Sequence, residues 1–234
     1  MGNEELLQRS PVRVFMNSIH GGLKGGELGL IAAPSGIGKT SVLVQIALDK
    51  LLLGRKVIHI SFSQHSAYVL AWYENIFGEF VKKKFIENDR EIKNDLVKNR
   101  VLMVFNQEGL SVDQILKSIR ALIKEGGFNA EAIIVDGFDF SIAAKAHIAA
   151  FKAFAAEMDL SVWFSCTVKG QEPFFDKRNI PLVLKDYEEL FSVIVVLDPK
   201  QDCIALTVSR DRDCYNPAHS ALKLDPKTLL LLEN

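Results

Sequence analysis

A glycine-rich segment at residues 33–40, Ala-Pro-Ser-Gly-Ile-Gly-Lys-Thr, is the feature that most constrains this chain. Apart from the alanine at its first position, it has the Gly-x-x-x-x-Gly-Lys-Ser/Thr spacing of a phosphate-binding loop. Residues 27–32 before it, apolar after Glu27, predict a short buried strand, and residues 41–53 after it predict a helix. A strand, a glycine-rich turn and a helix in this order bring backbone N–H groups and a helix N-terminus to one anion site.

The residue types within this segment suit a bound nucleoside triphosphate. Lys39 is expected to reach the β- and γ-phosphates, and the Thr40 hydroxyl is expected to hold Mg²⁺. The alternative is a glycine-rich turn in which Gly-Lys-Thr occurs by chance. We expect ATP and Mg²⁺ as cofactors, and the expected cofactor-binding residues are Ala33, Pro34, Ser35, Gly36, Ile37, Gly38, Lys39, Thr40 and Ser41.

Composition places the chain among globular proteins with a sizeable core. Its 234 residues are 48% hydrophobic and 24% charged, and this length favours one domain. A net charge of −1 gives no global basic field to attract nucleic acid, although a local basic face remains open. The three cysteines lack metal-type spacing and fit a reducing compartment. Because no apolar run resembles a signal peptide or reaches ~18 residues, we expect a cytoplasmic protein without a membrane partner.

Apolar runs and helical periodicities alternate along the chain after a polar-to-amphipathic lead-in at residues 1–20. Further strands are expected at residues 56–62, 101–105, 132–136 and 160–165. Helices are expected at residues 66–80, 112–123 and 148–158, with a charged helical excursion at 82–100. Closely spaced strands at residues 193–197, 204–208 and 221–224 predict an antiparallel edge. The expected fold class is therefore α/β, a single domain over residues 21–234 with a mostly parallel central sheet, helices on both faces and an antiparallel C-terminal edge.

Asp136 is the expected metal-binding carboxylate. It ends the apolar run 132–135, at the carboxyl tip of a strand predicted to be buried. In α/β sheets this edge forms the ligand crevice, and a carboxylate there beside a phosphate loop is placed to hold Mg²⁺. The alternative is a strand-ending aspartate that caps a turn.

The group that would activate water against the γ-phosphate is harder to assign. Gln64 follows the tip of the second expected strand; it can orient a water molecule but cannot accept a proton. His65 could accept one, although a surface polar residue is the simpler interpretation. Asp139 is the nearest spare carboxylate.

Arg210 and Arg212 follow the expected strand 204–208 and flank Asp211. Period-2 alternation predicts that both guanidinium groups point to one side, where they would suit an anion such as a neighbouring subunit's γ-phosphate. The alternative is an exposed arginine pair balanced by Asp211 and Asp213.

Together these segments resemble the RecA-like ATPases, most closely the motor domain of DnaB-type replicative helicases and KaiC/RadA-type proteins. The resemblance spans roughly residues 17–230. Its carriers are the Gly-Gly-Leu-Lys-Gly-Gly-Glu-Leu entry at 21–28, the alanine-initiated phosphate loop, Ser-Phe-Ser at 61–63, the segment 180–197, Arg210-Asp211-Arg212, and residues 222–230. It implies catalytic roles for Lys39, for the Gln64 position, and for Arg212 and Arg210 as fingers.

Two departures from this family shape the expected function. Gln64 stands where the family has its catalytic glutamate, and Cys166 stands where the helicases place a glutamine after the serine. One hypothesis is a weak or partner-stimulated ATPase that acts on DNA or a protein assembly, as a helicase-related protein would. The other is a nucleotide-binding regulator or scaffold that has lost hydrolysis, which the glutamine favours. Both imply a homo-oligomer with nucleotide-bridged interfaces. Direct DNA translocation ranks lower, since the loop 137–144 carries no basic residue.

Overall fold

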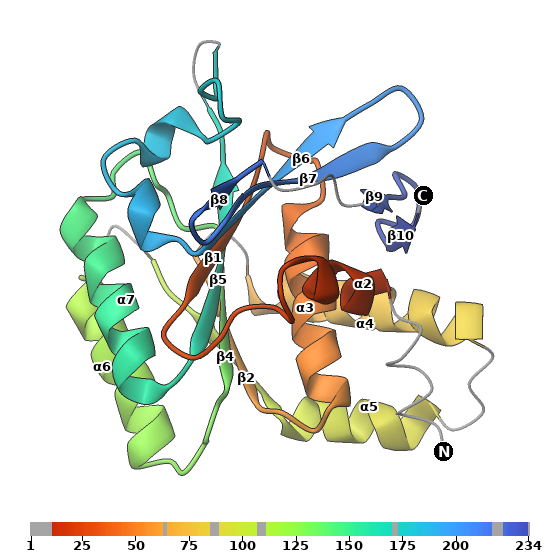
Figure 1. The fold of residues 1–234 in the computed structure, drawn as a ribbon. Coiled ribbons are helices and arrows are strands. Elements are labelled where there is room, and N and C mark those ends of the chain that lie inside the picture. The colour runs from red at the N-terminus through yellow and green to blue at the C-terminus, as the bar shows by residue number, and fades with distance from the viewer. Residues whose placement is uncertain are drawn as a thin grey trace.

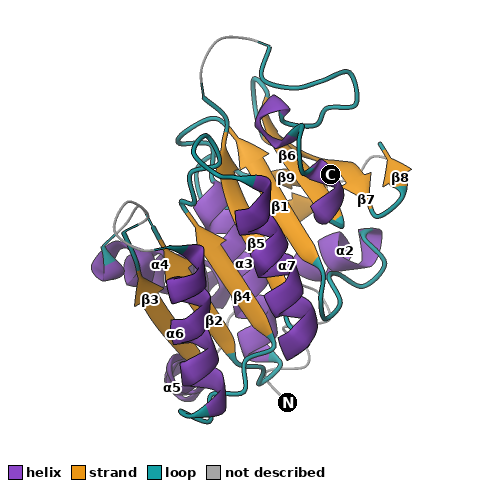
Figure 2. Ribbon diagram, turned by 90° about the vertical axis from the view of Figure 1, so that its left-hand side faces the viewer, coloured by secondary structure: helices purple, strands orange, loops and turns teal. Residues whose placement is uncertain are grey.

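The structure is a computed structural model, and Figure 1 shows its arrangement of helices and strands. It describes residues 11–62, 65–84, 89–106, 111–169, 173–216 and 222–233. Within these ranges ten strands form one sheet in the order β10-β9-β7-β6-β1-β5-β4-β2-β3, with β8 paired to β7. Helices cover both faces of this sheet (Figures 1 and 2).

Six strands of the sheet run parallel to one another and form its larger part. They are β1 Leu28–Ala33, β2 Val57–Ser61, β3 Arg100–Val104, β4 Ala132–Asp136, β5 Ser161–Thr167 and β6 Val193–Pro199. The remaining strands pair antiparallel and are β7 Ile204–Asp211, β8 Cys214–Tyr215, β9 Leu222–Leu224 and β10 Leu231–Glu233. The expected α/β class, with its mostly parallel sheet and antiparallel edge, is confirmed.

The strand order determines which loops meet. β1 lies between β5 and β6, and β5 separates β1 from β4. Residues Leu28–Ala33 pair in register with Val162–Thr167, so β1 and β5 end side by side. Since all these strands are parallel, the loops that follow β1, β4 and β5 gather at one edge of the sheet, where α/β proteins form their ligand crevices.

The helices form two layers, one on each face of the sheet (Figures 1 and 2). On one face lie α2 Pro11–Ser18, α3 Lys39–Leu52, α4 Ser66–Lys84 and α5 Asp89–Lys98. On the other lie α6 Val112–Lys124, α7 Lys145–Met158 and the 3₁₀ turns Leu182–Leu184 and Glu188–Leu190. Among the described helices, none has the length and apolarity needed to cross a bilayer.

The sheet separates two hydrophobic cores. In β1, Leu30 and Ala32 contribute to the core under α6 and α7, whereas Ile31 and Ala33 contribute to the core under α3. This alternation follows from the period of two along a strand. A strand covered on both faces is apolar at every position, which explains why the sequence of β1 is a continuous apolar run.

The expected lead-in needs a correction, because its second half is part of the domain. From residue 11 the chain forms α2, whose Val12, Phe15 and Met16 are buried in the core under α3. The Phe15 ring lies 5.9 Å from that of Trp163 on β5. The amphipathic pattern of this segment therefore reflects packing, and residue 20 is not a domain boundary.

Candidate functional site

The glycine-rich loop connects β1 to α3 through a left-handed turn. Gly36 and Gly38 have φ angles of 80° and 98°, a region that side chains strongly disfavour. A Cβ atom on Gly38 would also lie 2.5 Å from the Leu224 Cδ2 atom. Helix α3 then begins at Lys39, two residues before the expected start. Gly38 offers no capping side chain, so no side chain blocks the N-terminus of α3, where an anion is favoured.

Lys39 lies at the centre of this loop and is only 8% exposed. Its Nζ atom donates to the backbone carbonyls of Ala33 at 3.1 Å and Pro34 at 2.7 Å. Burial lowers the pKa of Lys39, and the negative charge of the nearby Asp136 carboxylate opposes that shift. The loop therefore keeps a cation at its base, bound to neutral carbonyl oxygens.

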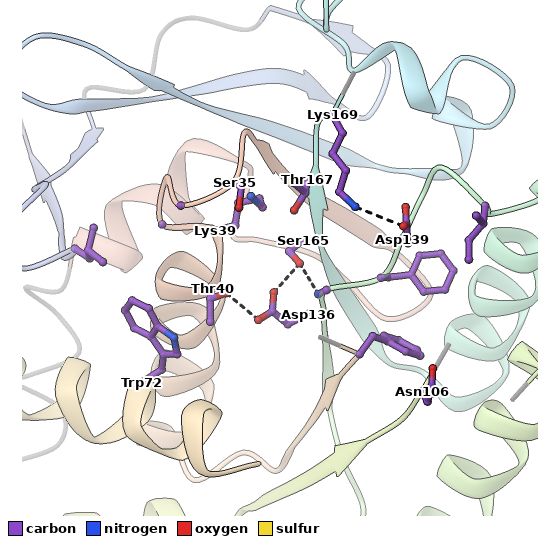
Figure 3. Close-up of a pocket in the computed structure, with 17 residues that line it drawn as sticks. Ser35, Lys39, Thr40, Trp72, Asn106, Asp136, Asp139, Ser165, Thr167 and Lys169 are labelled. Atoms are coloured by element: carbon purple, nitrogen blue, oxygen red, sulfur yellow. Dashed lines mark hydrogen bonds and ion pairs between the residues drawn. The ribbon is translucent and has the colours of Figure 1, made fainter. Parts of the chain in front are cut away.

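Asp136 lies at the carboxyl end of β4 and joins three elements (Figure 3). One carboxylate oxygen, Oδ2, accepts from the Thr40 hydroxyl of α3 at 2.8 Å. The other, Oδ1, accepts from the Ser165 hydroxyl of β5 at 2.6 Å. Ser165 Oγ in turn accepts from the Gly137 N–H at 2.8 Å. These bonds fix a 3%-exposed carboxylate beside the start of α3, as the sequence predicted.

The loop after Asp136 is anchored by aromatic packing. Phe138 and Phe140 point into the core, where both rings contact Phe164 at centroid distances of 6.0 and 5.9 Å. Asp139 lies between them and faces the other way, toward Lys169, with 3.5 Å between its Oδ2 atom and the lysine Nζ. The hydroxyl of Ser141 is the main cause of a lowered Asp139 pKa, to which Lys169 also contributes.

A cavity of about 550 Å³ opens at this edge of the sheet, between the ends of β1 to β5. The side chains labelled in Figure 3 line it. Its polar lining residues are Ser35, Lys39, Thr40, Asn106, Asp136, Asp139, Ser165, Thr167 and Lys169. Its apolar walls are Phe62, Trp72, Phe138, Ile142 and Leu229. The structure thus brings together Ser35, Gly36, Gly38, Lys39, Thr40 and Asp136 from the predicted set.

The other predicted loop residues face away from the cavity or contribute backbone. Ser41 donates its hydroxyl to the Leu229 carbonyl at 2.6 Å, which ties α3 to the C-terminal strands. Ala33 and Pro34 supply the carbonyls that Lys39 contacts. Gln64, expected to orient water, lies outside the described residues, as does Ser63 before it.

Arg210 and Arg212 are both engaged within the chain and point to different partners. Arg210 donates to the backbone carbonyls of Glu188 and Arg212 at 2.7 and 2.8 Å. Arg212 binds both carboxylate oxygens of Glu27, at 3.0 and 2.9 Å, and the Gly22 carbonyl at 2.9 Å. The two guanidinium groups thus have separate partners within the chain, and Arg212, with a left-handed backbone of φ 55°, follows the end of β7. Their alignment on one side stays a prediction.

Several cavity residues escaped the sequence analysis. Thr167 ends β5, and Lys169 lies two residues beyond it. Both reach the cavity because β5 pairs with β1, a long-range register that a single sequence does not reveal. Trp72 and Leu229 come from α4 and from the turn between β9 and β10. Their approach to the phosphate loop depends on long-range packing.

Thr40 and Asp136 are the protein groups that fit a Mg²⁺ ion. Among the residues the structure describes, no group of three or more His, Cys, Asp or Glu side chains could hold a metal by itself. Mg²⁺ in nucleotide sites is typically bound by one or two carboxylates, water and the substrate phosphates. A hydroxyl and a carboxylate 2.8 Å apart beside a phosphate-type loop fit that arrangement.

No protein-family model matches the chain, and a search of curated proteins finds no match either. The geometry and charge of the cavity are therefore the basis for assigning a function.

Proposed function

We propose that this chain is a nucleotide-binding domain of the RecA-like ATPase type, which binds Mg·ATP in the cavity at the carboxyl edge of its sheet. The observation that carries the proposal is the contact between Thr40 and Asp136, 2.8 Å long, directly after the lysine of the glycine-rich loop. The lysine and the hydroxyl are consecutive in the chain, whereas the carboxylate comes from a strand 96 positions after Thr40. Each has the chemistry that a metal-bound triphosphate requires.

The phosphates would bind at the glycine-rich loop. Positive φ angles at Gly36 and Gly38 turn the loop so that backbone N–H groups and the start of α3 face one point. Lys39 now contacts two neutral carbonyls. Phosphate oxygens would bind the ammonium more strongly than these carbonyls do, because both partners would then carry a charge.

The metal would bind between α3 and β4. Mg²⁺ neutralises phosphate charge and orients the phosphates. Thr40 and Asp136 would hold it, directly or through water. Ser165 bonds the second Asp136 oxygen and so fixes the orientation of the carboxylate.

The nucleoside would lie toward α4 and the C-terminal turn. Trp72 and Leu229 line the main cavity, and both also line an adjoining hollow of about 450 Å³. An aromatic ring and an aliphatic side chain suit the faces of a sugar and a base. The proposed site would therefore extend from the phosphate loop toward α4.

Hydrolysis is proposed to be weak or dependent on a partner. Asp136 is committed to the metal position, and Asp139, the other cavity carboxylate that the structure describes, has a lowered pKa and is a poor proton acceptor. Such a protein would act as a nucleotide-dependent oligomer or regulator.

A head-to-tail oligomer suits the position of Arg210. It pairs with Ile194 near the start of β6, and β6 runs parallel to β1. Arg210 therefore lies at the edge of the sheet opposite to the phosphate loop of its own chain. From there, Arg210 or the more exposed Arg212 could meet only a neighbouring subunit's nucleotide, and only through a heterologous interface.

A binding titration tests the proposal. Trp72 lines the cavity whereas Trp163 is buried, and the chain has just these two tryptophans, so Mg·ATP should change the emission of Trp72. Lys39→Met should weaken binding by at least about tenfold, because it removes charge-assisted bonds to phosphate. Lys50→Met, at the other end of α3, is the matched control and should bind as the unaltered chain does. Equal binding by Lys39→Met would refute the proposal, as would an unaltered chain that binds no Mg·ATP.

A further inference from the structure

Lys169 is a second lysine in the cavity, and the sheet register places it there. Thr167 pairs with Ala33, and the Val168 N–H donates to the Ala33 carbonyl at 3.1 Å. That carbonyl is the one that Lys39 also contacts. Lys169 therefore leaves β5 immediately beside the phosphate loop, and its side chain extends into the cavity (Figure 3).

The ammonium group of Lys169 has a weak partner in this structure. Its Nζ atom lies 3.5 Å from Asp139 Oδ2, and the two side chains are 63% and 37% exposed. An exposed ion pair of this length contributes little to stability. Moving the ammonium elsewhere in the cavity therefore costs little.

Asp139 is stabilised independently of this lysine. Its Oδ1 atom accepts from the Ser141 N–H at 2.9 Å and from the Ser141 hydroxyl at 2.6 Å. These bonds favour the ionised carboxylate and lower its pKa. The carboxylate would stay in place and charged after Lys169 had left.

Charge in the cavity also favours such a move. Lys39 and Lys169 balance Asp136 and Asp139 among the ionisable side chains that line it. Mg·ATP would add about two negative charges, which the cavity residues do not otherwise offset. A mobile cation at the rim is the group best able to respond.

We propose that Lys169 is a second phosphate-binding lysine, whose ammonium group moves from Asp139 to the terminal phosphate when Mg·ATP binds. This deepens the proposed function and rests on it. With Lys39 and Thr40 on one side of Asp136 and Lys169 on the other (Figure 3), a phosphate chain that starts at the loop extends toward Lys169. Lys169 would then distinguish triphosphate from diphosphate, because only the longer chain reaches it.

Calorimetric titration with Mg·ATP and Mg·ADP tests this assignment. Lys169→Ala should weaken Mg·ATP binding by about tenfold and Mg·ADP binding by less than about twofold. Lys169→Arg should retain most of the preference for ATP. Asp139→Asn should tighten Mg·ATP binding a few-fold, since it removes the group that competes with phosphate for the ammonium.

The control is Lys124→Ala on α6. Lys124 is 58% exposed and lies 3.6 Å from Glu157, so it matches Lys169 in exposure and pairing but does not line the cavity. It should leave both affinities unchanged. Since Lys169 is exposed, its variants should melt at the temperature of the unaltered chain.

The outcomes separate this inference from the function on which it rests. If Lys169→Ala keeps the ratio of ATP to ADP affinity while Lys39→Met loses binding, the role of Lys169 is overturned and nucleotide binding stands. If the unaltered chain binds neither nucleotide, both proposals fail. Equal weakening of ATP and ADP by Lys169→Ala would also overturn the assignment to the terminal phosphate.

Discussion

The Thr40 hydroxyl and the Asp136 carboxylate, 96 positions apart in the chain, lie 2.8 Å from each other at the base of the cavity. Each side chain is positioned by the element that carries it. The left-handed Gly38 starts α3 so that Thr40 falls in its first turn, and β4 carries Asp136 to the sheet edge. Ser165 then holds the second carboxylate oxygen at 2.6 Å. The proposed metal position rests on this contact.

The first prediction concerns this metal position. Asp136→Asn should remove most of the gain in ATP affinity that Mg²⁺ gives, because a neutral amide is a much weaker ligand for a hard cation than a carboxylate. Thr40→Val should act in the same direction. ATP titrations with Mg²⁺ and with excess chelator measure the gain.

Ser165→Ala is the positioning control for this experiment. It leaves both expected ligands intact but frees one oxygen of Asp136, so the Mg²⁺-dependent gain should shrink without disappearing. A full Mg²⁺-dependent gain in Asp136→Asn would show that the cation binds elsewhere.

The second prediction concerns turnover. Hydrolysis by the isolated chain should be slower than ~1 s⁻¹, the low end of typical enzyme rates. The reason is that Gln64, at the position of the general base, cannot accept a proton. Gln64→Glu should raise the rate, since loss of a general base typically costs about 10²–10⁴-fold. Phosphate release at saturating Mg·ATP measures both proteins. An unchanged rate in Gln64→Glu would count against the role assigned to Gln64. Fast turnover in the unaltered chain would show that another group, such as Asp139, serves as the base.

Local sequence was sufficient to predict the strands and helices whose apolar residues form an unbroken run or a regular helical stripe. β4 occupies residues 132–136 as predicted, because a fully buried parallel strand is apolar at every position. The stripe from Val112 to Ile123 became α6, which runs one residue further, to Lys124. In the site, Lys39, Thr40 and Asp136 were predicted because the motif fixes the first two and the strand end fixes the third.

What local sequence did not supply was the result of long-range pairing. Lys169 and Ser165 join the cavity because β5 inserts between β1 and β4, an order that no local pattern states. The two-residue β8 is too short to leave a periodic signal. The bonds of Arg212 to Gly22 and Glu27 also depend on long-range packing, since these partners lie 190 and 185 positions away in the chain.

The third prediction is a pH dependence of stability that comes from His59. This histidine on β2 is fully buried, and its Nδ1 atom lies 2.9 Å from the Tyr73 hydroxyl. Its Nε2 atom has no hydrogen-bond partner among the residues that the structure describes. Burial lowers the pKa of His59 from 6.5 to about 4. The unfolded chain therefore takes up a proton near pH 6.5, before the folded chain does.

Stability from His59 is thus fully present above pH 6.5 and decreases as the pH falls toward 4. Between pH 7 and 4.5 the loss should be about 2–3 kcal/mol, given ~1.4 kcal/mol per pKa unit. The double variant His59→Phe, Tyr73→Phe removes the titrating group and the hydroxyl that pairs with it. Urea midpoints at both pH values measure the difference between the two proteins. Burial raises the pKa of Asp49, so this residue makes the protein more stable as the pH falls. Its contribution is the same in both proteins and cancels in the difference between them. Parallel pH profiles would show that His59 does not govern this range.

The last prediction concerns Arg212. Its guanidinium group binds Glu27 through two bonds and the Gly22 carbonyl through a third, so it fastens the segment that enters β1 to the end of β7. It is 25% exposed, and hydrogen bonds that involve charged groups contribute about 1.5–3 kcal/mol. Arg212→Ala should therefore lower the free energy of unfolding by about 1–3 kcal/mol even without nucleotide, as urea denaturation would show.

A finger role in trans demands a second effect of the same substitution. With a non-hydrolysable ATP analogue, light scattering should show that the unaltered chain assembles and that Arg212→Ala does not. Both proteins are measured without urea, at a temperature at which both are fully folded. Glu27→Gln is the matched control, because it weakens the internal pair but leaves the guanidinium available to a neighbouring subunit's phosphate. Loss of stability in Arg212→Ala without any nucleotide-dependent assembly of the unaltered chain would assign Arg212 to the fold alone. Assembly that survives in Glu27→Gln but not in Arg212→Ala would assign it to the interface as well, since only the arginine can bridge to a phosphate.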